Sequence, residues 1–549
     1  MRPDTDYRVI DLEEHTSLLF LTGNHRSFVV PRETGERLRG GLDRLTPAER
    51  EEWERLGELG QITEDNRNVL ATSSFEDGAD LAVNVNLTNV CNLACTYCFA
   101  EGGDYGRITD AMGQTSVDDI FTFIDENLTD SQSVRFEFFG GEPLANFAVI
   151  KEICDRSVRH STERGITFVY RISTNLTLLP KGILDIFARH RFIVSVSIDG
   201  GREVQDLNRP AKGGRGSYDR VMSNAEKVRA ASDSISMVAR MTVAQREPSL
   251  IDNMRQLYDT NIFDYFQIYP GVFPVDDDPS ASSTPSTSST PSTPEPAPTG
   301  RAPVFLTMPT FPGQRTDDQE TPPATTSSCA TPAVTPGQHF INFFLQDGMV
   351  EQFRDFLAEY PRLFSPDNRF KGVLEYERTV QLAMEGQLAL AFCSGGRTYF
   401  THSPDRSVSP CHRLVGDQAF DVGNGAEGLT VEPTQWRLPV DDHPVCSGCW
   451  ARYICGGGCK QENFVATGDL NVLNQESCNY QLLLAEEVLR MMARSSEEYR
   501  STDRSQLSDM FVSCGRPVLP NSRTAPPDAH EAAGFTYFQQ LNGVEHTTV

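Results

Sequence analysis

The chain has 549 residues, with 76 acidic against 49 basic side chains and a formal net charge of −27. This length predicts two or three domains rather than one. The acidic balance argues against nucleic acid and against anionic membranes as partners, because both carry phosphate groups that need a basic surface. No apolar run reaches the about 18 residues that a membrane-spanning helix needs.

Residues 1–75 predict a small α+β unit. The segments YRVIDL, LLFLTG and SFVVP have the pattern of short strands, and a helix is expected to begin at Thr46-Pro47. The segment lacks the basic start and apolar run of a secretory signal, so we expect a cytoplasmic location. In that reducing compartment the thirteen cysteines are expected to be metal ligands or catalytic groups rather than disulfides.

Residues 80–275 alternate between strand and helix patterns. The predicted strands are 81–88, 133–140, 167–174, 192–199, 234–243 and 265–273. Strands that are separated by helices pair in parallel, so six such units predict an α/β fold, a partial (β/α)6 barrel resembling a TIM barrel. Cys154 stands alone on one of the predicted helices and is expected in the core.

Beyond the predicted barrel the composition changes. Residues 276–337 are dominated by Ser, Thr and Pro and have too few apolar residues to build a core, so we predict a disordered insertion. Residues 338–388 form a predicted helical bridge to a cysteine-rich domain at 389–485. The remainder, 486–549, is expected to hold the end of a helix and a flexible tail that includes Cys514.

Cys91, Cys95 and Cys98 form a CxxxCxxC loop directly after the first predicted barrel strand. Three thiolates can hold three irons of a 4Fe–4S cluster and leave the fourth iron open to a substrate or cofactor. Active sites of barrels gather at the carboxyl ends of the strands, where this loop lies. A zinc site is the alternative, but zinc usually closes its shell with four ligands, and no fourth ligand is nearby.

The segment CNLACTYCFA resembles the signature of the radical S-adenosylmethionine (AdoMet) superfamily, and further segments match that family in order. Phe139-Gly140-Gly141-Glu142-Pro143 follows the second strand, and polar residues end the third, fourth and fifth strands. The resemblance implies an AdoMet pocket made of Tyr97, Gly140, Gly141, Glu142, Pro143, Ser173, Asn175, Ser197, Asp199, Arg209 and Arg240. It also implies a cluster on the three cysteines and a 5′-deoxyadenosyl radical that abstracts hydrogen from a substrate.

Seven further cysteines lie between residues 393 and 478, and their spacing resembles the SPASM domain of enzymes that modify peptides and proteins. The resemblance implies two auxiliary 4Fe–4S clusters. The first would be held by Cys446, Cys449, Cys455 and Cys478, and the second by Cys393, Cys411 and Cys459. No cysteine lies just upstream of Cys393, so the second cluster is expected to have an open iron, and Arg406 stands where the pattern usually has a glycine. Zinc remains the alternative here as well.

His412 directly follows Cys411, where the sulfatase maturases of this group carry an aspartate that acts as a base. Imidazole titrates near neutrality, so we predict His412 as a catalytic base, with a hydrogen bond to a cluster as the alternative. The surrounding sequence is more similar to maturases that join a cysteine sulfur to a carbon of a precursor peptide. Residues 1–75 resemble a leader-peptide recognition element, which adds the leader to a sheet edge; a structural cap is the alternative.

The sequence therefore predicts a radical AdoMet peptide maturase that forms a thioether in a ribosomally made precursor peptide and takes electrons from a reductant such as ferredoxin or flavodoxin. The rival predictions are a maturase that forms carbon–carbon or ether cross-links, and a maturase of a protein subunit or sulfatase. From a different class, an iron–sulfur electron carrier or a zinc-binding module would need neither an AdoMet pocket nor an open iron.

Overall fold

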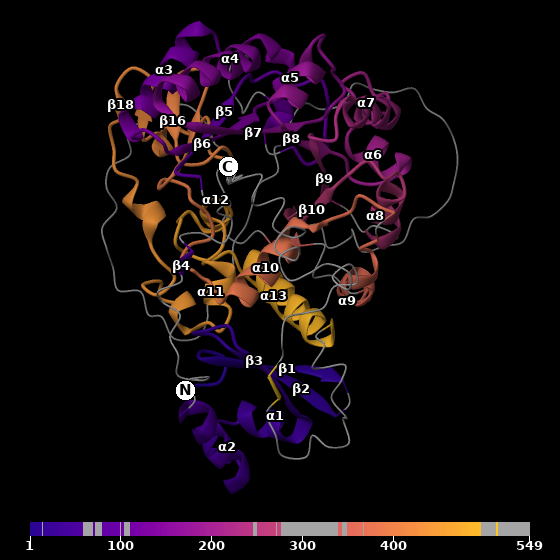
Figure 1. Cartoon of the computed structure of the whole chain (residues 1–549), viewed down its shortest axis with the longest axis vertical. Coiled ribbons are helices and arrows are strands. Elements are labelled where there is room, and N and C mark those ends of the chain that lie inside the picture. The colour runs from indigo at the N-terminus through magenta and orange to yellow at the C-terminus, as the bar shows by residue number, and fades with distance from the viewer. Residues whose placement is uncertain are drawn as a thin grey trace, which may run out of the picture.

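The computed structural model describes residues 1–13, 15–58, 70–71, 79–98, 100–103, 110–244, 250–270, 272–275, 339–342, 348–365, 367–495 and 512–513. The predicted insertion at 276–337 and most of the tail lie outside the described residues, and so do Cys329 and Cys514. Figure 1 shows the N-terminal unit at one end of the long axis and the parallel sheet with its helices at the other. Helices of the C-terminal half lie between these two parts.

The N-terminal unit holds a sheet that is buried on both faces. Its elements are β1 (Tyr7–Glu13), β2 (Thr16–Leu21), β3 (Ser27–Pro31), α1 (Arg32–Arg39) and α2 (Pro47–Glu58). Alternate residues point to opposite faces of a strand. Leu19 therefore packs with Leu38 and Trp53 beneath α1 and α2, whereas Phe20 packs with Trp450 of the cysteine-rich region. The predicted start of the helix at Thr46-Pro47 is confirmed, because Thr46 and Glu49 exchange hydrogen bonds as a capping box.

Six parallel strands form the centre of the molecule. They are β5 (Leu81–Asn86), β6 (Ser133–Phe139), β7 (Thr167–Thr174), β8 (Ile193–Ser197), β9 (Ser236–Val243) and β10 (Tyr265–Pro270), and they pair in chain order. The predicted α/β fold is confirmed. The sheet continues past both edges with strands that the sequence did not predict: β13 (Gly372–Val373) adds to β10, and β15 (Tyr399–His402) adds in parallel to β5. The strands β16 (Ser407–Ser409), β17 (Gly423–Asn424) and β18 (Gly428–Leu429) follow β15.

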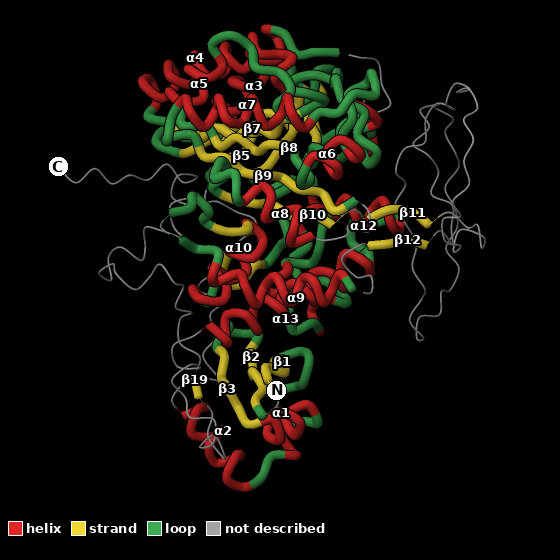
Figure 2. Tube along the Cα trace, turned by 90° about the vertical axis from the view of Figure 1, so that its right-hand side faces the viewer, coloured by secondary structure: helices red, strands yellow, loops and turns green. Residues whose placement is uncertain are grey.

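One face of this sheet carries the helices of the β/α units. They are α3 (Gln114–Asn127), α4 (Phe147–Arg164), α5 (Ile183–Arg189), α6 (Arg202–Asn208), α7 (Tyr218–Ala231) and α8 (Leu250–Tyr258). Figure 2 shows the helices layered over the strands. Phe136 and Phe138 point toward the helices and are fully buried, and Cys154 of α4 lies in the same core, as predicted. On the other face Val169, Ile193 and Val238 form a small apolar layer in the amino-terminal halves of their strands.

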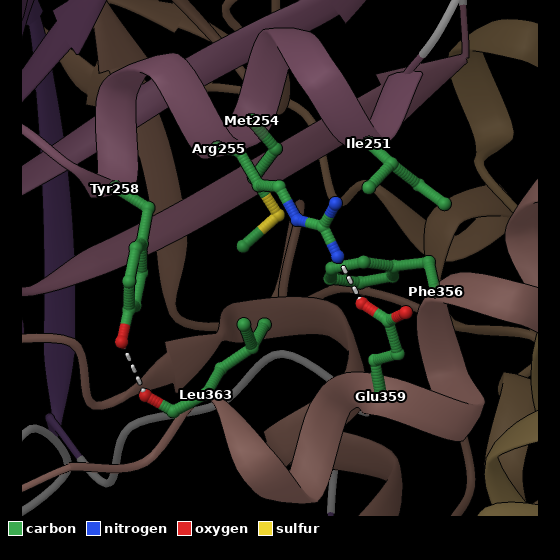
Figure 3. A pocket seen from close by; sticks show the side chains of 7 residues that line it. All are labelled: Ile251, Met254, Arg255, Tyr258, Phe356, Glu359 and Leu363. Carbon is green, nitrogen blue, oxygen red and sulfur yellow. Dashed lines mark hydrogen bonds and ion pairs between the residues drawn. The ribbon is translucent and has the colours of Figure 1, made fainter.

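The predicted bridge after residue 338 contains α9 (Met349–Glu359) and α10 (Leu374–Glu385), together with short strands. β11 (Val272–Val275) pairs with β12 (His339–Asn342), and β4 (Leu70–Ala71) pairs with β14 (Leu388–Ala389). Helix α9 lies against α8, and a shallow pocket between them is bridged by an ion pair of Arg255 with Glu359 (Figure 3).

The cysteine-rich region ends in α11 (Arg452–Cys455), α12 (Lys460–Thr467) and α13 (Gln475–Ser495). Helix α13 contacts α9, α10 and β1, so it joins the N-terminal unit to the rest of the molecule. Two residues of the tail, β19 (Val512–Ser513), pair antiparallel with β3. Among the residues that the structure describes, no helix is both long enough and apolar enough to cross a membrane.

Candidate functional site

The loop of Cys91, Cys95 and Cys98 follows β5 and is held from two sides. On one side Glu142 N donates to Val90 O at 2.8 Å. On the other side Ala94 N donates to Pro210 O at 2.8 Å, and Thr96 N donates to the carbonyl of Asn208 at 3.0 Å. The loop is therefore clamped between two segments that the sequence predicted for the AdoMet pocket.

Gly140 and Gly141 make the first of these contacts possible. Gly140 has φ +131°, a conformation that side chains other than glycine rarely adopt. A Cβ on Gly141 would lie 2.4 Å from Val90 O. The two glycines thus allow the backbone after β6 to touch the backbone that leads into Cys91, and Pro143 begins a short 3-10 helix directly afterwards.

The thiols of the loop lie near enough to act on one another electrostatically. Burial raises the pKa of Cys95 to about 12; the Arg209 guanidinium opposes this, and Cys98 and Cys91 add to it. Asn175 Nδ2 points at Cys91 Sγ across 3.7 Å. No group of three or more His, Cys, Asp or Glu side chains in the described part of the chain is arranged to hold a single metal ion. A donor set of thiols alone fits an iron–sulfur cluster, whose several irons need ligands that stand apart.

The carboxylate of Glu142 is turned inward. It is 1% exposed and accepts hydrogen bonds from Leu144 N at 3.0 Å, Thr174 Oγ1 at 2.6 Å and Asn175 N at 2.8 Å. Burial raises its pKa to about 7, although the hydrogen bonds oppose the shift. Glu142 therefore ties the turn after β6 to the end of β7 and places the Asn175 side chain beside Cys91.

Asp199 accepts hydrogen bonds from several groups at the end of β8. It accepts from Arg209 Nε at 3.0 Å, from Thr242 N at 3.0 Å and from the Tyr97 hydroxyl. The Arg209 guanidinium lies over the Tyr97 ring, 5.1 Å from its centre. Burial raises the pKa of Tyr97, so its phenol stays protonated and donates to Asp199. Tyr97 thus anchors the cysteine loop to the barrel.

Ser173, Ser197 and Arg240 lie at the carboxyl ends of β7, β8 and β9. Ser197 and Arg240 are direct partners in the sheet register. The Arg240 guanidinium lies 5.9 Å from the ring centre of Phe139 and 5.2 Å from that of Tyr269. These three predicted residues therefore line the same end of the parallel sheet as the cysteine loop.

Two buried acceptors at this end of the sheet, Asn86 Oδ1 and Asn208 Oδ1, have no hydrogen-bond partner in the described residues. Asn86 lies against Gly140, and Asn208 lies beside Asp199. Buried polar atoms in proteins are rarely left unpaired. Polar groups of a bound cofactor would satisfy them, so the residues present fit AdoMet beside a three-thiolate cluster.

His412 is partly buried between the barrel and the cysteine-rich region. Tyr399 Oη and His412 Nδ1 are 2.8 Å apart, and the imidazole packs 4.8 Å from the centre of the Phe139 ring. Burial lowers the pKa of His412 to about 3, with Glu137 opposing and Arg240 and Arg413 adding to the shift. This pKa lies far below the near-neutral titration that the sequence argument assumed. The assignment of His412 as a base stays a prediction, and the imidazole is neutral at pH 7.

The seven later cysteines fall into two groups, and in each group one thiol has its pKa raised by the others. Burial raises the pKa of Cys455, and Cys478, Cys446 and Cys449 raise it further. Burial also raises the pKa of Cys459; among its other neighbours Cys411 and Cys393 act in the same direction. The structure thus brings together the two sets that the SPASM resemblance implies, a four-cysteine set and a three-cysteine set.

Arg406, the departure from the SPASM pattern, has φ +67°, which explains why glycine is usual at this position. Its guanidinium pairs with Asp119 of α3 at 2.6 Å and so ties the β15–β16 turn to the barrel.

Glu137 is a buried charged residue that the sequence reasoning missed. It accepts hydrogen bonds from Arg135 Nε at 2.9 Å and Arg171 Nη1 at 3.4 Å inside the barrel. Charged residues at alternate positions of a predicted buried strand were the signal that could have found it.

Comparison with known proteins agrees with this geometry. The family model described as Radical SAM superfamily matches residues 85–247. A cysteine-type anaerobic sulfatase-maturating enzyme of Clostridium novyi (strain NT) is 27% identical over 190 residues, which are 34% of this chain and 50% of that protein. A serine-type anaerobic sulfatase-maturating enzyme of Klebsiella aerogenes is 30% identical over 131 residues, which are 23% of this chain and 31% of that protein. The chain thus spans half or less of these curated relatives.

The fold has solved counterparts. The structure of native anSMEcpe with bound AdoMet and the Cp18Cys peptide superposes with a TM-score of 0.52 at 16% sequence identity. The superposition covers 75% of this chain and 98% of that chain. The likeness is one of fold. The family match at 85–247 contains the three-cysteine loop, the Gly140–Gly141 turn and the Asp199 cluster.

Proposed function

We propose that this chain, whose residues 85–247 form a radical SAM domain, is an enzyme that uses AdoMet to modify a peptide or protein. The observation that carries the proposal is the clamped loop of Cys91, Cys95 and Cys98 beside the Asp199 cluster at the carboxyl end of a parallel sheet. When bound, the cluster and AdoMet supply a 5′-deoxyadenosyl radical that abstracts a hydrogen atom.

The chain's own residues hold and shield this site. Tyr97 and Arg209 fix the cysteine loop through Asp199, and Glu142 fixes Asn175 beside Cys91. The ring of Phe139 and the guanidinium of Arg240 border the interior of the barrel next to it. Farther inside, Glu137 accepts hydrogen bonds from Arg135 and Arg171, so these charged residues of the interior are paired with one another.

For the bond formed, we propose a thioether between a cysteine sulfur and a carbon of a ribosomally made precursor peptide. The three-cysteine set supports it, because a cluster held by three thiolates has an iron that a substrate thiolate can bind. His412 stands where the sulfatase maturases carry an aspartate base, and its pKa of about 3 makes it a weak base. The reductant is proposed to be a ferredoxin or flavodoxin.

A sulfatase-type maturase is the second candidate, because the relatives in Clostridium novyi and Klebsiella aerogenes carry that name. The two reactions change a cysteine peptide differently. Thioether formation removes two hydrogens and keeps the sulfur, whereas conversion of cysteine to formylglycine removes the sulfur and adds oxygen. High-resolution mass spectrometry of a cysteine peptide encoded beside the gene, after incubation with the enzyme, separates them.

The first experiment measures 5′-deoxyadenosine formed by the anaerobically reconstituted protein with AdoMet and dithionite. Its control is the triple variant Cys91→Ala/Cys95→Ala/Cys98→Ala. Product from the wild type alone is the expected result. No product from either, with iron loaded and the clusters spectroscopically intact, would favour an electron carrier or binding module instead.

A further inference from the structure

A chain of hydrogen bonds joins the two sets of cysteines in the C-terminal region. Arg413 Nη1 points at Cys459 Sγ across 4.0 Å and donates to Glu462 Oε1 at 2.9 Å. The other oxygen of the same carboxylate accepts from Ser477 Oγ at 2.7 Å. Ser477 directly precedes Cys478 in the sequence. The connection therefore runs from the three-cysteine set to the four-cysteine set through one carboxylate.

Three separate elements supply this connection. Arg413 lies in the loop two residues after Cys411. Glu462 lies in the first turn of α12, and this helix begins directly after Cys459. Ser477 lies in the first turn of α13. The side chains of Arg413 and Glu462 are 23% and 26% exposed, and Ser477 is 8% exposed. Partly buried charges interact more strongly than charges in open solvent. A bridge from three elements also resists displacement of any one of them.

The two charged members stand beside Cys459 with opposite charges. The Arg413 guanidinium lies 4.0 Å from Cys459 Sγ, and its partner Glu462 lies in the first turn of α12, which begins directly after Cys459. Both charges bear on an added electron, since net charge and hydrogen bonds to the sulfurs set the reduction potential of an iron–sulfur cluster. A nearby cation favours the reduced cluster, and a nearby anion favours the oxidised cluster.

We propose that Arg413 and Glu462 are positioning residues that set the reduction potential of the cluster on Cys393, Cys411 and Cys459 so that it accepts an electron from the product. The proposal rests on the proposed thioether formation. Joining R–H and R′S–H as R–S–R′ removes one hydrogen atom, which the deoxyadenosyl group takes, and one proton from the thiol. One electron remains on the product and has to leave, and the cluster takes it up.

The test is a redox titration followed by electron paramagnetic resonance. The first cluster is removed with the triple variant Cys91→Ala/Cys95→Ala/Cys98→Ala, and Cys393→Ser identifies the transition of the three-cysteine set. Arg413→Gln is expected to lower the midpoint potential of that transition so that the reduced fraction falls about tenfold, which is about 59 mV for one electron. Glu462→Gln is expected to raise the midpoint by a similar amount. Arg413→Lys keeps the charge and is expected to stay near the parent.

The control is Arg156→Gln, which removes an arginine of a distant ion pair with Asp118 and is expected to leave both transitions unchanged. If the clusters load and neither Arg413→Gln nor Glu462→Gln moves the transition in its expected direction, the inference is wrong and the proposed function stands. If Arg413→Gln fails to load iron, Glu462→Gln decides alone: a raised midpoint supports the inference, and an unchanged or lowered one overturns it. If the parent has no auxiliary cluster signal, both the inference and the thioether proposal fall, while 5′-deoxyadenosine formation still tests the radical chemistry.

Discussion

Asp199 Oδ1 accepts a hydrogen bond from Arg209 Nε at 3.0 Å, and both side chains are buried at the carboxyl end of β8. Because Tyr97 donates to the other oxygen of Asp199, this one carboxylate connects the cysteine loop to the barrel. Thr242 N adds β9 to the same connection. The buried ion pair of Asp199 and Arg209 is therefore one of the contacts that fix the cysteine loop on the barrel.

Asp199→Asn is expected to destabilise the barrel and to abolish 5′-deoxyadenosine formation. Removal of one partner of a buried ion pair leaves the other charge uncompensated and costs about 3–5 kcal/mol. Thermal unfolding and the product assay measure the two effects. Asp219→Asn removes a solvent-exposed partner of Arg202 and serves as the matched control, with no measurable change expected. Unfolding of Asp199→Asn at the wild-type temperature would contradict this account.

Gly141→Ala is expected to displace the cysteine loop and to lower the iron bound at Cys91, Cys95 and Cys98. The added Cβ would meet Val90 O at 2.4 Å, so the backbone before Cys91 must move. Iron analysis and the spectrum of the reduced protein measure the loss. Gly113→Ala is the control, because a Cβ there meets nothing within 4 Å. Full iron loading in Gly141→Ala would show that the close approach is not needed.

Local patterns in the sequence predicted the six parallel strands, because alternation of buried positions and the spacing of helices are visible without the fold. The two sets of later cysteines were implied only by the resemblance to the SPASM domain. Tertiary effects were not predictable in this way. The inward turn of Glu142 depends on Thr174 and Asn175 from another strand, and the low pKa of His412 comes from burial that only the packed structure supplies. The added strands β13 and β15 are too short to show a pattern.

Phe20→Ala is expected to loosen the N-terminal unit from the rest of the molecule. Phe20 is fully buried, and its ring lies edge-on to Trp450 with 6.0 Å between the ring centres. Truncation of a buried phenylalanine costs about 3–5 kcal/mol. Faster cleavage between the unit and the barrel in limited proteolysis checks the effect. Val158→Ala on α4, where the side chain is 51% exposed, is the control and should be cleaved like the wild type.

Val512→Pro is expected to strengthen binding of a peptide strand to the N-terminal sheet. The sheet order β1-β2-β3-β19 places Val512–Ser513 along β3, at one of the two edges where an added strand could pair. Proline cannot donate to a strand ladder, so the substitution weakens this pairing. Fluorescence anisotropy of a labelled precursor peptide measures the change. Equal affinity of the wild type and Val512→Pro would show that the peptide binds elsewhere.

Glu49→Gln is expected to make the N-terminal unit less stable at neutral pH and equally stable in strong acid. Burial raises the pKa of Glu49, but hydrogen bonds from Arg37, Thr34 and Thr46 outweigh it and lower the pKa from 4.5 to about 2. The carboxylate therefore stays charged in the folded unit at a pH where the unfolded chain is already protonated. Its stabilising contribution is complete above about pH 5, falls as the pH drops through 4.5, and is lost near pH 2.

The difference between the wild type and Glu49→Gln is expected to be about 3–4 kcal/mol at pH 7 and to vanish as the pH falls, since one pKa unit corresponds to about 1.4 kcal/mol. Urea unfolding followed by tryptophan fluorescence, to which Trp53 of this unit contributes, measures it at a series of pH values. Glu33→Gln, at a side chain that is 85% exposed, is the matched control and should follow the wild type at every pH. A constant difference across the series would mean that Glu49 stabilises the unit by packing and not by its charge.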